Sequence, residues 1–120
     1  MNQTNKKTTM ILVIAAIIAI IILVYYFQIN SNPEEKTMKC IAKNSELYVL
    51  KTCSHCAQQK IMLRNYIDLF EITDCGDNTK KCVEDGIIED DKVSIPSWII
   101  NGEKYTGVRT IEQLKELTGC

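Results

Sequence analysis

Residues 47–56 read LYVLKTCSHC, a short apolar run followed by a Cys-x-x-Cys motif. Leu47 to Leu50 is β-prone and predicts a buried strand. The next segment, 57–69, is rich in helix formers and carries an apolar face at roughly helical spacing. Cys53 and Cys56 are therefore predicted to lie between a strand and a helix.

Strand and helix signals alternate further along the chain. Residues 69–73 can form a second strand, and residues 79–85 a short helix that ends at Gly86, a typical residue after a helix C-terminus. Residues 97–100 and 103–106 predict two strands.

The last third of the chain has the clearest local signals. Asn101-Gly102, between the two predicted strands, is the strongest two-residue hairpin signal. Thr110 is expected to cap a final helix, with Gln113 placed as in a capping box. The order β-α-β-α-β-β-α predicts an α/β domain over residues 46–120, with a mixed sheet and helices on its faces. Trp98 is predicted to lie in the core.

A long apolar run precedes this domain. Residues 10–27 read MILVIAAIIAIIILVYYF and carry no charge, and as a helix they would span about 27 Å, close to the thickness of a bilayer core. We expect a single transmembrane anchor here. A cleaved signal peptide is the main alternative, although the bulky residues at the end of the run suit a signal peptidase poorly. A buried core helix is the other.

The charges that flank this run predict its orientation. Lys6 and Lys7 precede it and acidic residues follow it, so residues 1–9 are expected in the cytoplasm. The domain would then face the periplasm, the cell exterior or an organelle lumen. Residues 28–45, which contain Pro33, are expected to form a tether without regular structure.

Composition narrows the possible functions. The net charge of −1 does not point to a nucleic-acid partner. Six cysteines in 120 residues are typical of a protein in an oxidising compartment, of a metal site or of redox catalysis.

The position of the motif favours redox chemistry. Amides and the dipole at a helix N-terminus stabilise an anion, so Cys53 is expected to be held as a thiolate, well below the free thiol pKa of about 8.5. Cys56 is placed to resolve a mixed disulfide formed by Cys53, and His55, when protonated, would further favour the thiolate. A stabilised thiolate implies an oxidising couple, so we expect a disulfide donor.

Other uses of the motif remain open. Cys53 and Cys56 could form half of a zinc site, with Cys75 and Cys82 as the other half, although the spacing of the second pair is poor for a zinc knuckle. The motif could also be an inert structural disulfide. We expect neither a metal nor a cofactor.

Ile95-Pro96 is the second informative site. A proline directly before a strand can simply mark the start of that strand. Its position about forty residues after the motif, before a strand, a hairpin and a helix, instead matches the cis-proline loop of thioredoxin folds. A cis bond there would leave the backbone of Ile95 free to pair with an extended substrate.

Several stretches carry a resemblance to one family. They are Leu47-Tyr48, the motif Cys53-Ser-His-Cys56, the pair Cys75 and Cys82, and the segments IPSWIING at 95–102 and YTGVR at 105–109. Together they resemble the thioredoxin-like domain that is fused to, or partnered with, bacterial and archaeal homologues of vitamin K epoxide reductase. The resemblance covers about residues 46–119.

The resemblance implies a thioredoxin-like fold and a function. Cys53 would take electrons from folding secreted proteins, and a quinone-linked membrane partner would reoxidise Cys53 and Cys56. Here the multi-helix reductase is absent from the chain, so that partner would be a separate protein. Ser54 stands where the family has proline, and residues 88–93 add length before the Ile95-Pro96 loop.

Four cysteines lie outside the motif. Cys75 and Cys82 are expected to form a local bridge, with a relay of electrons between site and partner as the alternative. Cys40 and Cys120 could form a disulfide that joins the tether to the C-terminus. With Cys53 and Cys56 joined, three pairings of the other four are possible, and an intermolecular bridge is also open.

We therefore expect a membrane-anchored oxidoreductase that acts on protein thiols. A reductase or disulfide isomerase fed by a membrane electron donor is the alternative within this class. A non-catalytic ectodomain, stabilised by disulfides or zinc and binding a partner, is the alternative from another class.

Overall fold

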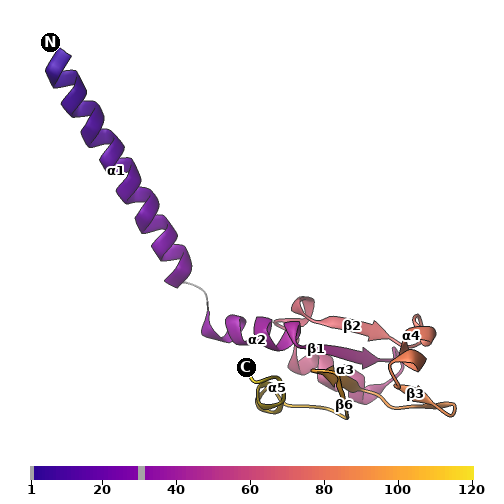
Figure 1. Cartoon of the computed structure of the whole chain (residues 1–120). Helices are drawn as coiled ribbons and strands as arrows, with labels where there is room; N and C mark the ends of the chain where they lie inside the picture. The colour runs from indigo at the N-terminus through magenta and orange to yellow at the C-terminus, as the bar shows by residue number, and fades with distance from the viewer. Residues whose placement is uncertain (1, 30–31) are drawn as a thin grey trace. The chain divides into compact units, whose positions relative to one another are not determined.

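The structure is a computed structural model of the chain that describes residues 2–29 and 32–120, with side chains from residue 5. The chain forms two compact units, and the boundary between them falls between Pro33 and Glu34. Figure 1 shows the course of the chain from helix α1 to the C-terminus.

The first unit is the helix α1, Asn2–Ile29. Its stretch Asn5–Ile29 is long and apolar enough to cross a membrane, with a mean hydropathy of 3.1. None of its most apolar part is buried by the protein, which disfavours the alternative of a core helix. A signal sequence would satisfy the same criteria of length and composition.

The second unit begins with a helix that the sequence analysis missed. Residues 28–45 were expected to form an irregular tether, but residues 33–43 form α2, Pro33–Lys43, so this prediction is wrong for most of the segment. Proline suits the first turn of a helix, where its missing N–H has no partner to lose. Met38 and Ile41, 2% and 0% exposed, anchor α2 in the core.

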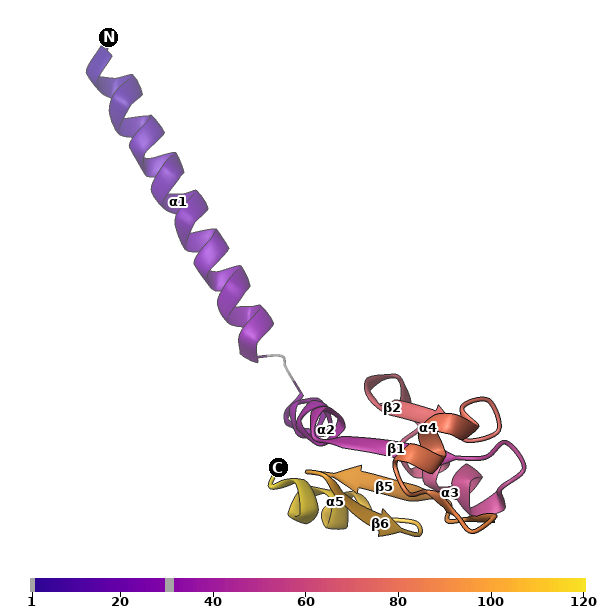
Figure 2. The same cartoon turned by 45° about the vertical axis from the view of Figure 1, so that its right-hand side comes forward.

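A four-stranded sheet forms the centre of this unit. Its strands are β1 Ser45–Val49, β2 Glu71–Asp74, β5 Ser97–Ile100 and β6 Glu103–Thr106. They are arranged in the order β2-β1-β5-β6, which Figure 2 shows from top to bottom. β1 pairs with β2 in parallel, whereas β1–β5 and β5–β6 are antiparallel. The predicted mixed sheet is therefore confirmed.

Helices and a small hairpin lie between the strands, and one helix follows the last strand. They are α3 Ser54–Met62, a 3₁₀ turn Ile67–Leu69, α4 Thr79–Glu84, the hairpin β3 Ile88–Glu89 with β4 Lys92–Val93, and α5 Ile111–Thr118. α3 is shorter than the predicted segment 57–69, because the chain turns after Met62. The extra length at residues 88–93 is the β3–β4 hairpin.

The C-terminal signals are confirmed in detail. Asn101 and Gly102 both have positive φ, 51° and 83°, as a tight hairpin turn requires. At the start of α5, the Thr110 hydroxyl accepts a hydrogen bond from the backbone of Gln113, and the Gln113 side chain accepts one from the backbone of Thr110.

Two apolar clusters lie on opposite faces of the sheet, because side chains alternate along a strand. Leu47 and Val49 belong to one cluster, together with Trp98 and residues of α2, α3 and α5. Tyr48 belongs to the other cluster, with residues from the α4 region. Trp98 is fully buried, as predicted.

Candidate active site

Three predicted site elements gather at one end of the sheet. β1 ends at Val49, and Cys53 follows shortly after. Ser97, the first residue of β5, pairs with Tyr48 near the same end of β1, so Pro96 lies at this end as well. The backbone N–H of Cys75 donates to the Val49 carbonyl over 2.9 Å, which places the second cysteine pair at the end of the parallel neighbour β2.

Cys53 is the N-cap residue of α3. Its backbone is extended, and its Sγ accepts a hydrogen bond from the N–H of Cys56 over 3.1 Å, as a serine or aspartate oxygen does in other helices. The N–H of Cys53 donates to the Leu50 carbonyl, which closes the turn between strand and helix. Cys53 and Cys56 form a disulfide, with their Cα atoms 5.2 Å apart.

The two cysteines differ in exposure. Cys53 is partly exposed, whereas Cys56 is 1% exposed and belongs to the core. Ser54 and His55, between them, are both exposed. An incoming thiolate can therefore approach Cys53 from solvent while Cys56 is shielded. The electrostatic role of His55 stays a prediction.

The Ile95-Pro96 peptide bond is cis, as predicted. Pro96 is buried, and Ile95 is partly buried and packs against both apolar clusters. The segment is held on both sides: the Ser94 N–H donates to the Ile87 carbonyl over 2.9 Å, and the Pro96 carbonyl accepts from the Gly107 N–H over 2.7 Å. Binding of substrate by Ile95 and Pro96 stays a prediction.

One buried residue near the motif was missed by sequence reasoning. Gln59 lies one turn after Cys56 on α3 and is 0% exposed. Its side chain bonds both backbone polar groups of Arg109, and it also accepts from the indole N–H of Trp98. The sequence around Gln59 does not indicate this role, because its main hydrogen-bond partners are backbone groups of Arg109. A residue of any type at that position would offer the same backbone groups.

Cys75 and Cys82 are paired as the sequence analysis favoured. Cys75 and Cys82 form a disulfide with Cα atoms 5.7 Å apart, and they are 2% and 0% exposed. This disulfide packs with Tyr48, on the opposite face of the sheet from Cys56. Four sulfurs from the two pairs therefore do not converge on one zinc site. In the parts of the chain that the structure describes, no group of three His, Cys, Asp or Glu residues could hold a metal.

The third disulfide lies at the other end of the sheet. Cys40 of α2 and Cys120 bond to each other, with Cα atoms 6.0 Å apart. The side-chain amide of Asn44, just before β1, is 3.9 Å from each sulfur. Cys53, in contrast, follows the far end of β1.

Charged residues surround Tyr48 on the α4 face. The Tyr48 hydroxyl donates to Asp85 over 2.6 Å, and the Lys81 ammonium lies 2.8 Å from both of these side chains. Lys81 also pairs with Glu46 at 3.0 Å. Burial, followed by the bond to Asp85, raises the pKa of Tyr48 above its ordinary value. The bonds from Lys81 and then Tyr48 lower the pKa of Asp85.

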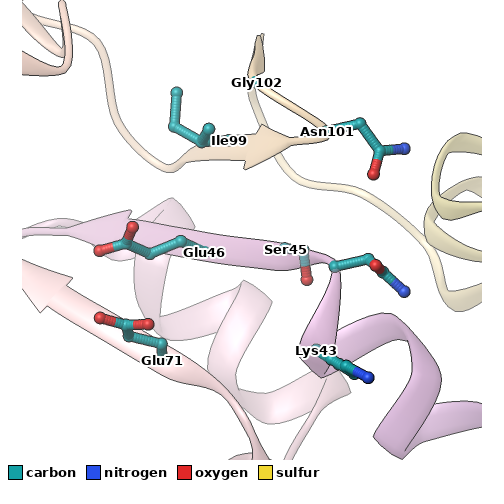
Figure 3. A pocket seen from close by; sticks show the side chains of 8 residues that line it. Lys43, Ser45, Glu46, Glu71, Ile99, Asn101 and Gly102 are labelled. Atoms are coloured by element: carbon teal, nitrogen blue, oxygen red, sulfur yellow. The ribbon is translucent and has the colours of Figure 1, made fainter.

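A shallow hollow of about 370 Å³ lies at the start of β1 and the end of β5. Figure 3 shows its polar lining, including Glu46 and Glu71 on neighbouring strands and Asn101 in the hairpin turn. Its position is at the sheet end opposite Cys53, and no cysteine lines it.

The arrangement at the start of α3 can exchange a disulfide with an external thiol. It has a partly exposed cysteine, a buried partner cysteine, and helix amides that would stabilise the thiolate released on reduction. No protein-family model matches the chain.

Proposed function

We propose that this chain is a membrane-anchored thiol–disulfide oxidoreductase that oxidises cysteines of secreted or membrane proteins. The observation that carries the proposal is the Cys53–Cys56 disulfide at the N-terminus of α3, with Cys53 partly exposed and Cys56 buried. Buried disulfides stabilise many proteins without taking part in a reaction, but a purely structural disulfide does not need a partly exposed cysteine whose sulfur caps a helix.

A thioredoxin-like fold is part of this proposal. It is supported by the mixed sheet order β2-β1-β5-β6, by helices on both faces, and by the motif between β1 and α3. The Ile95-Pro96 segment before β5 lies at the same sheet end as the motif, where the resemblance would place a substrate loop.

The reaction transfers two electrons and two protons from the substrate. A substrate thiolate attacks Cys53 Sγ, the Cys53–Cys56 bond breaks, and Cys56 leaves as a thiolate that takes up a proton. A second substrate thiolate then attacks the substrate sulfur of the mixed disulfide and releases Cys53. The substrate gains a disulfide, and Cys53 and Cys56 are reduced to two thiols.

Reoxidation requires a partner that accepts these electrons. We propose a quinone-linked membrane protein similar to vitamin K epoxide reductase, which forms a disulfide of its own and returns it to Cys53 and Cys56. Anchoring through residues 10–27, with the N-terminus in the cytoplasm, would keep the domain on the side of the membrane where secreted proteins fold.

The test is a redox titration of the full chain in detergent micelles. The protein would be equilibrated in graded glutathione buffers, and its thiols and disulfides mapped by alkylation and mass spectrometry. A Cys53–Cys56 couple between roughly −120 and −200 mV supports an oxidase or isomerase, and a value near about −270 mV supports a reductase instead.

The same sample tests the alternative of a non-catalytic domain. The oxidised chain would be mixed with a reduced dithiol peptide, and one disulfide in the peptide should appear for each Cys53–Cys56 bond lost. A motif that stays closed in mild reductant, or stoichiometric zinc in the purified chain, would exclude the proposed activity.

A further inference from the structure

Gln59 is a polar residue on the apolar face of α3. Cys56, Gln59 and Leu63 follow one another at helical spacing, and each is at most 1% exposed. An apolar side chain would fill the position of Gln59 without the cost of removing an amide from water. Both its oxygen and its nitrogen nevertheless have hydrogen-bond partners, which suggests that these directed bonds matter.

These hydrogen bonds join α3 to a distant segment. The Gln59 Nε2 donates to the Arg109 carbonyl over 3.0 Å, and the Gln59 Oε1 accepts from the Arg109 N–H over 2.7 Å. The Gln59 side chain thus forms with Arg109 the same pair of N–H and carbonyl hydrogen bonds that two residues on adjacent strands form. The indole N–H of Trp98 adds a longer bond, 3.3 Å, to the same oxygen.

The segment that Gln59 holds also supports the Ile95-Pro96 loop. Arg109 lies two residues after Gly107, whose N–H donates to the Pro96 carbonyl over 2.7 Å. A short series of contacts therefore leads from Cys56, through Gln59 and residues 107–109, to Pro96. It connects the disulfide to the loop on the other side of the candidate site.

We infer that Gln59 is a positioning residue that sets the location of the Cys53–Cys56 disulfide relative to the Ile95-Pro96 loop. This inference rests on the proposed function, because the relation matters only when a peptide must contact the loop and Cys53 together. A small dithiol needs only the sulfur. Gln59 therefore affects the oxidation of peptides far more than the oxidation of dithiothreitol.

The test compares two rates in the full chain in detergent micelles. The first is the rate at which the Cys53–Cys56 disulfide oxidises a reduced dithiol peptide, and the second is its rate with dithiothreitol. In Gln59→Met, the ratio of peptide rate to dithiothreitol rate should fall about tenfold or more, since small misplacements of a reacting group cost large factors in rate. The reduction potential of the disulfide should not change.

Gln58→Met is the matched control. Gln58 is the preceding residue of the same helix and is exposed, so this substitution makes the same chemical change without touching Arg109. Its rate ratio should equal that of the wild type. Gln59→Asn keeps the amide but shortens the side chain, so it should also lower the rate ratio. If Gln59→Met does not fold, Gln59→Asn tests the positioning role in its place.

Each outcome has a distinct meaning. A wild-type chain that oxidises neither the peptide nor dithiothreitol contradicts the proposed function. An active wild type with an unchanged ratio in a folded Gln59 variant overturns only the positioning inference. Loss of folding in both Gln59 variants also overturns it, because Gln59 would then have a structural role alone.

Discussion

The sulfur of Cys53 lies 3.1 Å from the backbone nitrogen of Cys56 and accepts its N–H hydrogen bond. This contact places the sulfur of Cys53, the more exposed residue of the pair, at the positive end of α3. When the disulfide opens, the same N–H is in position to stabilise a thiolate on Cys53, whereas Cys56 is enclosed in the core. The two cysteines are therefore not equivalent.

This difference predicts distinct phenotypes for two substitutions. Cys53→Ser should abolish peptide oxidation, because no accessible sulfur remains. Cys56→Ser should accumulate mixed disulfides when mixed with an oxidised substrate, because Cys53 attacks the substrate disulfide and no second thiol releases it. Mass spectrometry under non-reducing conditions measures both. Equal and full activity in the two variants would contradict the mechanism.

The Cys75–Cys82 disulfide should behave as a structural bridge. Both sulfurs are buried on the face of the sheet opposite Cys56, where a partner's thiolate has no direct approach. In the graded redox buffers, this pair should stay closed at potentials that fully reduce Cys53 and Cys56. Parallel opening of both pairs, measured by alkylation, would favour the electron relay instead.

The Cys40–Cys120 disulfide should contribute stability without affecting activity. It joins α2 to the C-terminus across a sequence separation of 80 residues, and it lies at the sheet end opposite the motif. Replacing both cysteines by serine should lower the free energy of unfolding by about 2–4 kcal/mol, because the unfolded chain gains freedom. Urea unfolding followed by Trp98 fluorescence measures this loss.

Activity provides the control for this variant. The folded protein without Cys40 and Cys120 should oxidise the dithiol peptide at the wild-type rate. A large loss of rate in the folded variant would show that this disulfide takes part in the reaction.

The helix α2 shows why part of the fold escaped prediction. Its sequence, PEEKTMKCIAK, offers only a few apolar residues, so no periodicity stands out. Signals for a helix were nevertheless present: proline in the first turn, followed by Glu34 and Glu35, and Lys43 at the end. The prediction of a tether gave Pro33 the role of a helix breaker, whereas it lies in the first turn of α2. The C-terminal hairpin and cap were predictable because their signals depend only on neighbouring residues.

In the candidate site, too, some residues could be predicted from the sequence and others could not. The motif and Ile95-Pro96 were found because their residue types are rare in this arrangement. Gln59 was not found, because its hydrogen bonds go to the backbone of Arg109, 50 positions away, and leave no pattern of residue types. Only the packing of α3 against residues 107–109 reveals its partners.

Asp85 should make stability decline in acid. Its pKa is lowered in the folded protein, so the unfolded chain binds its proton first as the pH falls below about 4. The free energy of unfolding should then fall with pH. Lys81→Met removes the largest cause of the shift and should make the decline shallower. Lys80→Met, which changes an exposed neighbour, should leave the decline as in the wild type.

Tyr48 should make stability decline in alkali. Burial and the bond to Asp85 raise its pKa, so the folded protein keeps the phenolic proton after the unfolded chain has lost it near pH 10. Above that pH the unfolded state binds fewer protons, and stability therefore falls as the pH rises. Lys81, whose pKa is also raised, chiefly by Asp85, adds to this loss in the same range.

Tyr48→Phe tests whether the Tyr48 hydroxyl contributes to this decline. The ring stays packed with Ile87, but the hydroxyl that binds Asp85 and Lys81 is removed. The variant should be less stable than the wild type near neutral pH, and its free energy of unfolding should decline less steeply above about pH 10. Urea unfolding of both proteins at a series of pH values measures the two slopes. Equal slopes would show that the Tyr48 proton is not linked to folding.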